Sequence, residues 1–177
     1  GYEPAGSTAF LNNPQYYVMQ ALNEHSSYLC LQDTYFYMTG SNWDQTRELS
    51  ARYLGAQIVF KSIDVPDPVL LGQDYLFAMQ WVNRGTAPLM YGRRDGIKDV
   101  ATSYDIELTF TNASTGAEAY QYTFTPNVPT TNWYTAQPVW IEEYIWIPSN
   151  LPAGDYDLRV ALVRPDLETT DPARYFA

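Results

Sequence analysis

The period of apolar residues along the chain changes near Gly55. Before this point, residues 14–25 and 41–54 carry apolar side chains at helical spacing. After it, apolar side chains recur at every second position, which is typical of strands with one buried face. The pattern predicts a helical or irregular N-terminal segment over residues 1–55 and a β domain over residues 56–177.

Six segments of the β domain show the strand pattern. They are residues 56–65, 75–83, 103–112, 118–125, 141–147 and 156–163. Loops rich in Gly and Pro separate these segments. Such residues interrupt both helices and the hydrogen-bond ladders between strands. Short strands with almost no helix between them predict an antiparallel β-sandwich of the jelly-roll or immunoglobulin-like kind.

The alternation also predicts which side chains the strands bury. For residues 103–112, the expected inward side chains are those of Tyr104, Ile106, Leu108 and Phe110, with Glu107 and Thr109 facing water. For the last strand, they are those of Tyr156, Leu158, Val160 and Leu162. Around residues 141–147, strand spacing favours a place in the core for Trp140, Tyr144 and Trp146.

Aromatic residues are unusually abundant. The 177 residues include 16 Tyr, 5 Trp and 7 Phe, and the tyrosine hydroxyl suits half-buried strand faces and wet binding surfaces. The formal net charge of −10 argues against nucleic acid or an anionic membrane as a partner. No apolar run in the sequence approaches the roughly 18 residues of a membrane-spanning helix.

The residue types that most catalytic and metal sites need are scarce. Cys30 and His25 are the single cysteine and histidine, which excludes an internal disulfide and a zinc site of the Cys/His type. Glu142 and Glu143 are adjacent in a strand and point to opposite faces, so they cannot flank one glycosidic bond. We expect no catalytic residue and no cofactor, although acidic pairs leave room for a structural calcium ion. These pairs are Asp64/Asp67, Asp95/Asp99 and Asp155/Asp157.

The loop over residues 126–140 is the strongest candidate for binding. Trp133 and Tyr134 offer flat rings to the C–H face of a sugar, while Asn132 and Gln137 can bond its hydroxyl groups. We therefore predict a glycan site at these four residues. Packing of the loop onto the domain is an equal alternative for the two aromatic residues.

A second loop, residues 86–101, combines cations with an aromatic group. Tyr91 lies close in sequence to Arg93 and Arg94, whose guanidinium groups suit sulfate or carboxylate. An anionic algal or plant polysaccharide would bind to these three residues. The alternative is that the cations pair with acidic residues of the domain.

Four short motifs together resemble one family. They are Leu22-Asn-Glu-His-Ser-Ser-Tyr28, Arg52-Tyr-Leu-Gly-Ala-Gln-Ile-Val59, Val82-Asn-Arg-Gly-Thr-Ala-Pro88 and Leu151-Pro-Ala-Gly-Asp-Tyr-Asp-Leu158. The family comprises uncharacterised carbohydrate-associated β-sandwich domains that follow a glycoside-hydrolase-like barrel in secreted bacterial proteins. The resemblance implies an extracellular protein whose residues 1–55 pack on, or link from, an upstream catalytic domain of the same polypeptide. The family has no established catalytic residues in this domain, so none is carried over.

The sequence thus predicts a non-catalytic carbohydrate-binding module or accessory domain of a secreted polysaccharide-degrading enzyme. Its partners would be a polysaccharide or oligosaccharide and the upstream catalytic domain. Two alternatives stay open. One is a purely structural sandwich that supports the neighbouring barrel, and the other is a polysaccharide lyase or hydrolase.

Overall fold

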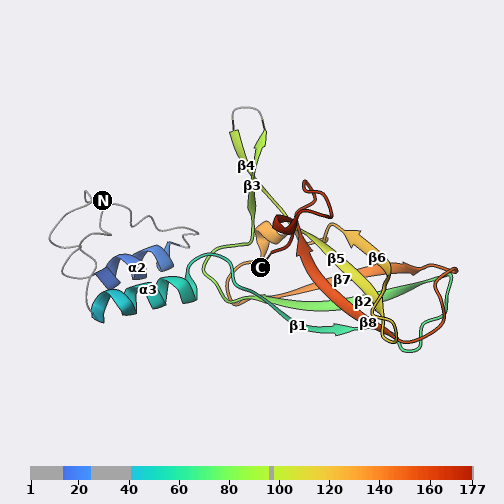
Figure 1. Cartoon of the computed structure of the whole chain (residues 1–177). Helices are drawn as coiled ribbons and strands as arrows, with labels where there is room; N and C mark the ends of the chain where they lie inside the picture. The colour runs from blue at the N-terminus through green and yellow to red at the C-terminus, as the bar shows by residue number, and fades with distance from the viewer. Residues whose placement is uncertain (1–13, 25–40, 96–97, 177) are drawn as a thin grey trace. The chain divides into compact units, whose positions relative to one another are not determined.

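A computed structural model describes residues 14–24, 41–95 and 98–176 of the chain, without some side chains within 14–17, 41–47 and 93–100. The described part is mainly β (Figure 1). Its α-helices are α2 (Pro14–Asn23) and α3 (Ser41–Tyr53), which confirms the two predicted helices. The strands are β1 (Ile58–Asp64), β2 (Gln73–Asn83), β3 (Tyr91–Asp95), β4 (Lys98–Thr102), β5 (Asp105–Asn112), β6 (Glu118–Phe124), β7 (Pro138–Ile147) and β8 (Tyr156–Val163). Two short 3-10 helices are η2 (Thr130–Asn132) and η3 (Pro172–Arg174).

The chain forms two compact units, which we describe separately. The first contains α2, α3 and the chain up to Val59, together with residues 82–88 and 134–137. The second contains residues 60–81, residues 89–133 and the chain from Pro138 onward. The boundary at Gly55 that the sequence suggests stays a prediction.

A turn around Asn83 organises the first unit. The buried Asn83 side chain accepts hydrogen bonds from the backbone N–H groups of Gln57 (3.0 Å) and Gly85 (2.9 Å). It donates one to the carbonyl oxygen of Ala87 (2.7 Å). A Cβ atom at Gly85 would lie 2.1 Å from the carbonyl oxygen of Gly55, so only glycine fits there. Asn83 and Gly85, which belong to the motif over residues 82–88, therefore shape the backbone of this unit.

Two three-stranded sheets make up most of the second unit. Their strand orders are β1-β2-β7 and β6-β5-β8. In the latter, β5 pairs antiparallel with both neighbours and places Ile106 opposite Phe124 and Leu162. The ring of Phe77 on β2 contacts that of Phe110 on β5, with centroids 6.2 Å apart. Buried side chains of the two sheets therefore contact each other in the core, and the prediction of a mainly β chain with antiparallel sheets is confirmed.

Residues 91–95 and 98–102 form a pair of antiparallel strands. Strands β3 and β4 pair antiparallel with Tyr91 opposite Thr102, and they stand apart from the other strands of the unit (Figure 1). The expected loop over residues 86–101 is therefore wrong for this part of the chain. The sequence carries a signal for this pairing in Gly96, because glycine is frequent at the first of two residues that connect paired strands.

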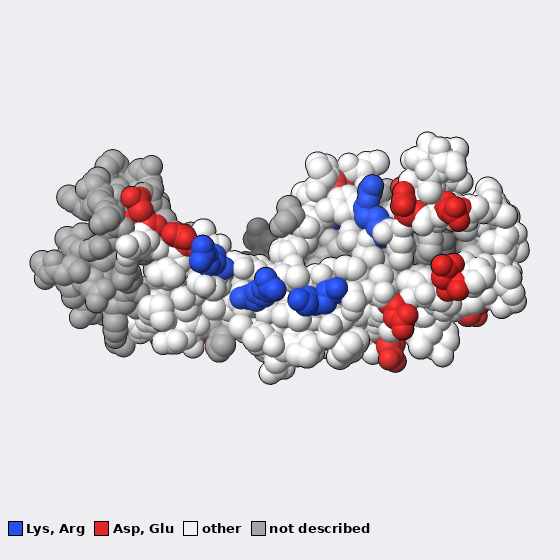
Figure 2. Space-filling view, turned by 90° about the horizontal axis from the view of Figure 1, so that it is seen from below, with Lys and Arg blue, Asp and Glu red and all other residues white. Residues whose placement is uncertain are grey.

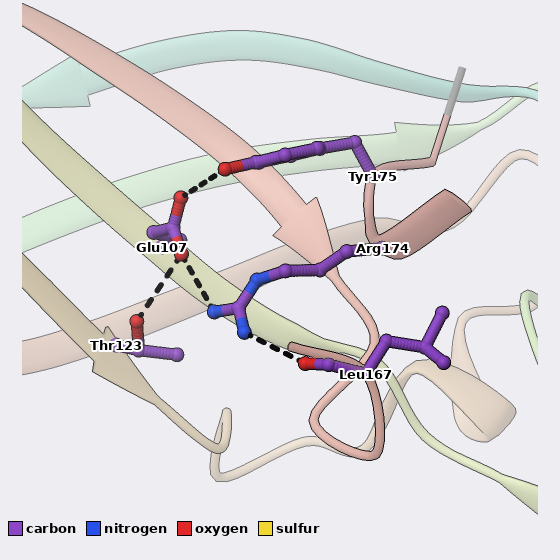
Figure 3. Close-up of polar contacts among 5 residues, drawn as sticks. All are labelled: Glu107, Thr123, Leu167, Arg174 and Tyr175. Atoms are coloured by element: carbon purple, nitrogen blue, oxygen red, sulfur yellow. Dashed lines mark hydrogen bonds and ion pairs between the residues drawn. The ribbon is translucent and has the colours of Figure 1, made fainter. Parts of the chain in front are cut away.

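The C-terminal segment covers the outer face of β5. Glu107 and Thr109, expected to face water, are buried, and Glu107 is only 2% exposed. The Glu107 carboxylate accepts a hydrogen bond from Arg174 Nη2 (2.7 Å) and one from the Tyr175 hydroxyl (3.3 Å), as Figure 3 shows. Arg174 also donates to the carbonyl oxygen of Leu167 (3.1 Å). The sequence-based expectation fails because these partners come from the far end of the chain and replace the water that a carboxylate needs.

Two tyrosines of β6 join its sheet to β7 of the other sheet. The Tyr120 hydroxyl donates to the carbonyl oxygen of Trp146 (3.0 Å), and the Tyr122 hydroxyl donates to Glu143 Oε1 (3.1 Å). At the opposite side of the unit, β1 and β8 are the edge strands. The inward side chains of β8 are less buried there than expected, since Tyr156 and Leu158 keep part of their surface exposed.

Candidate functional site

The outer face of β7 carries three large aromatic side chains. Trp140 is 58% exposed, Tyr144 is 66% exposed and Trp146 is 46% exposed. The side chains that β7 buries are those of Val139, Ile141, Ile145 and Ile147. The expectation that the three aromatic residues belong to the core is therefore wrong. Both faces of the strand are apolar, so a period of two could not decide which face turns inward.

The three rings form a row along the strand. Because a strand rises about 3.4 Å per residue, Tyr144 and Trp146 lie about 7 Å apart along β7, and Trp140 lies about 14 Å from Tyr144. Glu142 is exposed on the same face between Trp140 and Tyr144. The exposed Leu76 extends the face onto β2, the neighbouring strand. The face thus combines flat rings with a carboxylate and an aliphatic side chain.

Such a face has a definite binding chemistry. Aromatic rings offer an apolar surface to the C–H groups of a sugar ring, and a carboxylate accepts hydrogen bonds from its hydroxyl groups. A contiguous exposed apolar patch with polar neighbours is a common mark of an interaction surface. We therefore take the row of Trp140, Tyr144 and Trp146 as the candidate site.

The tyrosines that join β6 to β7 fix the backbone behind this row. The bond from Tyr120 ends on the backbone of Trp146 itself. Burial raises the pKa of Tyr120. The pKa of Tyr122 is also raised, first by burial and second by its hydrogen bond to Glu143. Both hydroxyl groups therefore stay protonated at neutral pH and remain hydrogen-bond donors.

Trp133, the central residue of the loop site that the sequence predicts, is fully buried at 0% exposure. Its indole N–H donates to the carbonyl oxygen of Val128 (2.9 Å), and its ring packs 5.5 Å from that of Trp81. The exposure expected of Trp133 is therefore wrong, and the alternative of loop packing describes it. An indole buried in this way offers no face to a ligand.

The other residues of that loop site are exposed. Asn132 ends η2 in the second unit. Tyr134, which is 54% exposed, and Gln137 belong to the first unit, where the N–H of Gln137 donates to the carbonyl oxygen of Tyr134 (3.4 Å). This turn brings Tyr134 and Gln137 together, and their role in binding stays a prediction.

Tyr91 is a buried residue. Its ring packs edge-on against that of Tyr104 (5.1 Å), and the guanidinium group of Arg164 lies 4.6 Å from the centre of the Tyr91 ring. Arg93 and Arg94 belong to β3, and their side chains lie outside the described part. The anion site expected at these residues therefore stays a prediction, although its aromatic member is not on the surface.

The described residues include no group of three or more Asp, Glu, His or Cys side chains that could hold a metal ion. The acidic pair Asp95/Asp99 has side chains outside the described part, and so do His25 and Cys30. The structural calcium ion stays a prediction. Of the adjacent glutamates, Glu142 is exposed on the outer face and Glu143 bonds to Tyr122.

Neither α2 nor α3 is long and apolar enough to cross a membrane.

A comparison with protein-family models and a search of curated proteins both gave no match. The resemblance that the four motifs suggest therefore stays a prediction.

Proposed function

We propose that the chain is a non-catalytic carbohydrate-binding module or accessory domain of a secreted polysaccharide-degrading enzyme. In this proposal the second unit is a β-sandwich, and the row of Trp140, Tyr144 and Trp146 binds the glycan. The observation that carries the proposal is the exposure of all three rings on one strand face. The contact between Phe77 and Phe110 and the tyrosine bonds between β6 and β7 support the sandwich.

The charges beside the row favour an uncharged glycan. Glu142 lies between two of the rings, and β7 contains no Lys or Arg. A carboxylate accepts hydrogen bonds from sugar hydroxyl groups but repels uronate and sulfate groups. Arg93 and Arg94 would instead favour an anionic polymer. The class of glycan that binds therefore indicates which of the two sites is used.

Glu107, Glu142 and Glu143 form no catalytic pair, which supports a non-catalytic role for the sheets that carry them. Glu107 is fully engaged by Arg174 and Tyr175. Glu142 and Glu143 do not converge on one side of the strand. A pair of carboxyl groups about 5–9 Å apart across a sugar, as glycoside hydrolysis usually needs, is not formed by these three residues.

Affinity electrophoresis against a panel of polysaccharides tests the proposal. The panel contains uncharged plant glucans and mannans, pectin, alginate and sulfated algal polymers. We expect retardation by an uncharged polymer, with affinity at least about fivefold weaker in Trp140→Ala and in Tyr144→Ala, because interface aromatics commonly contribute more than about 1 kcal/mol. Tyr134→Ala serves as the comparison, since it alters an exposed ring of the predicted loop site and leaves β7 unchanged.

Two results would overturn the proposal. Migration that no polymer retards would remove glycan binding altogether. Retardation that persists in both β7 variants and disappears in Tyr134→Ala would move the site to the loop. Retardation by anionic polymers alone would contradict the uncharged ligand and direct attention to Arg93 and Arg94.

A further inference from the structure

A cleft of about 680 Å³ lies between the two sheets at the side where β1 and β8 are the edge strands. The connection from β1 to β2 and the turn from β7 to β8 form its walls. The buried rings of Phe77 and Phe110 and the side chain of Leu158 lie at its inner end. Its volume is in the range of about 300–1,000 Å³ that is usual for binding pockets.

The polar side chains of the cleft are almost all carboxylates. Asp64, Asp67 and Asp155 line it and are exposed, and its lining contains no Lys, Arg or His. Within the described residues, no cation forms an ion pair with any of the three. Acidic side chains gather at this end of the strands on the face shown in Figure 2. A lining of this kind accepts hydrogen bonds and favours a cationic donor with an apolar stem.

The edge of β8 beside the cleft has backbone groups available for pairing. One side of β8 pairs with β5 along its whole length. On the other side, the C-terminal segment pairs only with the end of the strand, through the bridge from Tyr175 to Val163 and the bond from Phe176 N to Leu162 O. In the described part of the chain, residues 156–161 therefore form an unpaired edge. An exposed edge of this kind is a template for an added strand.

Apolar side chains of the cleft beside this edge are incompletely covered. Leu71 in the β1–β2 connection is exposed, and Leu158 on β8 is half-buried; both line the cleft. An added strand would place alternate side chains over these groups. Its remaining side chains would point to the opposite face. The side chains that reach Asp64, Asp67 and Asp155 in the cleft therefore belong to the same alternate positions as the apolar ones.

We propose that this open edge binds an extended polypeptide segment of a partner protein, in which every second residue, on the side that faces the cleft, is apolar or basic. The partner backbone pairs with β8, its apolar side chains enter the cleft, and its Lys or Arg side chains contact Asp64, Asp67 and Asp155. A second copy of this chain fits poorly, because each copy carries a net charge of −10 and the copies repel. The inference is independent of the glycan site on β7.

Fluorescence anisotropy tests this proposal with a short labelled peptide in which every second residue is in turn valine or lysine and threonine lies between them. The matched probe has glutamate in place of each lysine. We expect the lysine peptide alone to bind, with an affinity that decreases as salt is added. Asp64→Asn and Asp155→Asn should each weaken binding by up to about fivefold, the range for exposed ion pairs. Glu168→Gln removes the same charge beyond the other end of β8 and should leave binding unchanged.

The backbone pairing is tested by methylating alternate amide nitrogens of the lysine peptide, which removes hydrogen-bond donors from one edge and leaves the charge unchanged. We expect this peptide not to bind. Failure of the lysine peptide to bind, equal binding of the glutamate or methylated peptide, or equal weakening by Glu168→Gln would each overturn the proposal. The proposal would also be overturned if the protein formed a concentration-dependent dimer whose affinity increased in Asp64→Asn and Asp155→Asn, because the edge would then bind a second copy of the chain. Oligosaccharide binding that Ala153→Trp blocks in the cleft, without peptide binding, would assign the cleft to a glycan instead.

Discussion

The outer faces of the two sheets differ in what covers them. On the sheet β6-β5-β8, the C-terminal segment covers Glu107 with Arg174 and Tyr175. On the sheet β1-β2-β7, the described residues leave Trp140 and Tyr144 largely in contact with water. One face thus buries a charge, and the other exposes rings whose burial would be favourable.

This difference indicates that the exposed rings are available to a partner. Covering one large apolar side chain typically stabilises a protein by about 1.5–3 kcal/mol, so the three rings of β7 represent a considerable potential gain. The C-terminal segment provides cover at Glu107 and not at these rings. Under the proposed function a glycan covers this surface, and the following predictions test each side of the comparison.

Removal of the buried cation should have the largest effect. In Arg174→Ala, the Glu107 carboxylate keeps only the Tyr175 and Thr123 hydroxyl groups as partners. Breaking one side of a buried ion pair typically costs about 3–5 kcal/mol. We expect a loss of this size in the free energy of unfolding, measured by urea denaturation. The double variant Glu107→Met/Arg174→Met is the control and should be nearly as stable as the parent protein. A loss below about 1 kcal/mol in Arg174→Ala would mean that the C-terminal segment does not hold this face.

The sequence predicts strands well where the two faces of a segment differ. In residues 103–112, polar and apolar residues alternate, and the predicted inward residues Ile106 and Leu108 are fully buried. In β7 both sets of alternate residues are apolar, so burial of Ile141 and Ile145 instead of Trp140 depends on the facing sheet. Local alternation carries no information on that choice.

The sequence fails for the candidate site because burial there depends on distant residues. Trp133 lies in a polar stretch that suggests exposure. In the structure its ring packs against that of Trp81 on β2, and its indole N–H donates to the carbonyl oxygen of Val128. Glu107 has the spacing of a solvent-facing residue, yet Arg174 reaches it from the end of the chain. In both cases the deciding contact is tertiary, and a pattern of neighbouring residues cannot reveal it.

A change where β6 and β7 are hydrogen-bonded should have an intermediate effect on stability. Tyr122→Phe removes the hydroxyl group that donates to Glu143 and keeps the ring. We expect a loss of about 1 kcal/mol in the free energy of unfolding, the usual net value of such a bond. Because the pKa of Tyr122 is raised, the folded state keeps this proton to higher pH than the unfolded chain, whose tyrosines titrate near pH 10.

The pH dependence has a definite sign. The contribution of Tyr122 is complete below about pH 10 and decreases as the pH rises through the folded-state pKa. Urea denaturation at neutral and alkaline pH should therefore show a smaller alkaline loss of stability in Tyr122→Phe than in the parent protein. Tyr120→Phe, at the other hydroxyl of this edge, is the matched comparison and should behave in the same way. Identical alkaline profiles in all three proteins would contradict the role of these hydroxyl groups.

Removal of an exposed ring should have the smallest effect on stability. Trp140→Ala deletes a side chain that is 58% exposed, and substitutions on such surfaces usually change the free energy of unfolding by less than about 0.5 kcal/mol. Trp133→Ala is the matched control, because it deletes the same side chain from a fully buried position and should cost about 3–5 kcal/mol. Urea denaturation of both variants measures the difference. If Trp140→Ala destabilised the protein as much as Trp133→Ala, the outer face of β7 would be part of the core, and its rings would not be available to a glycan.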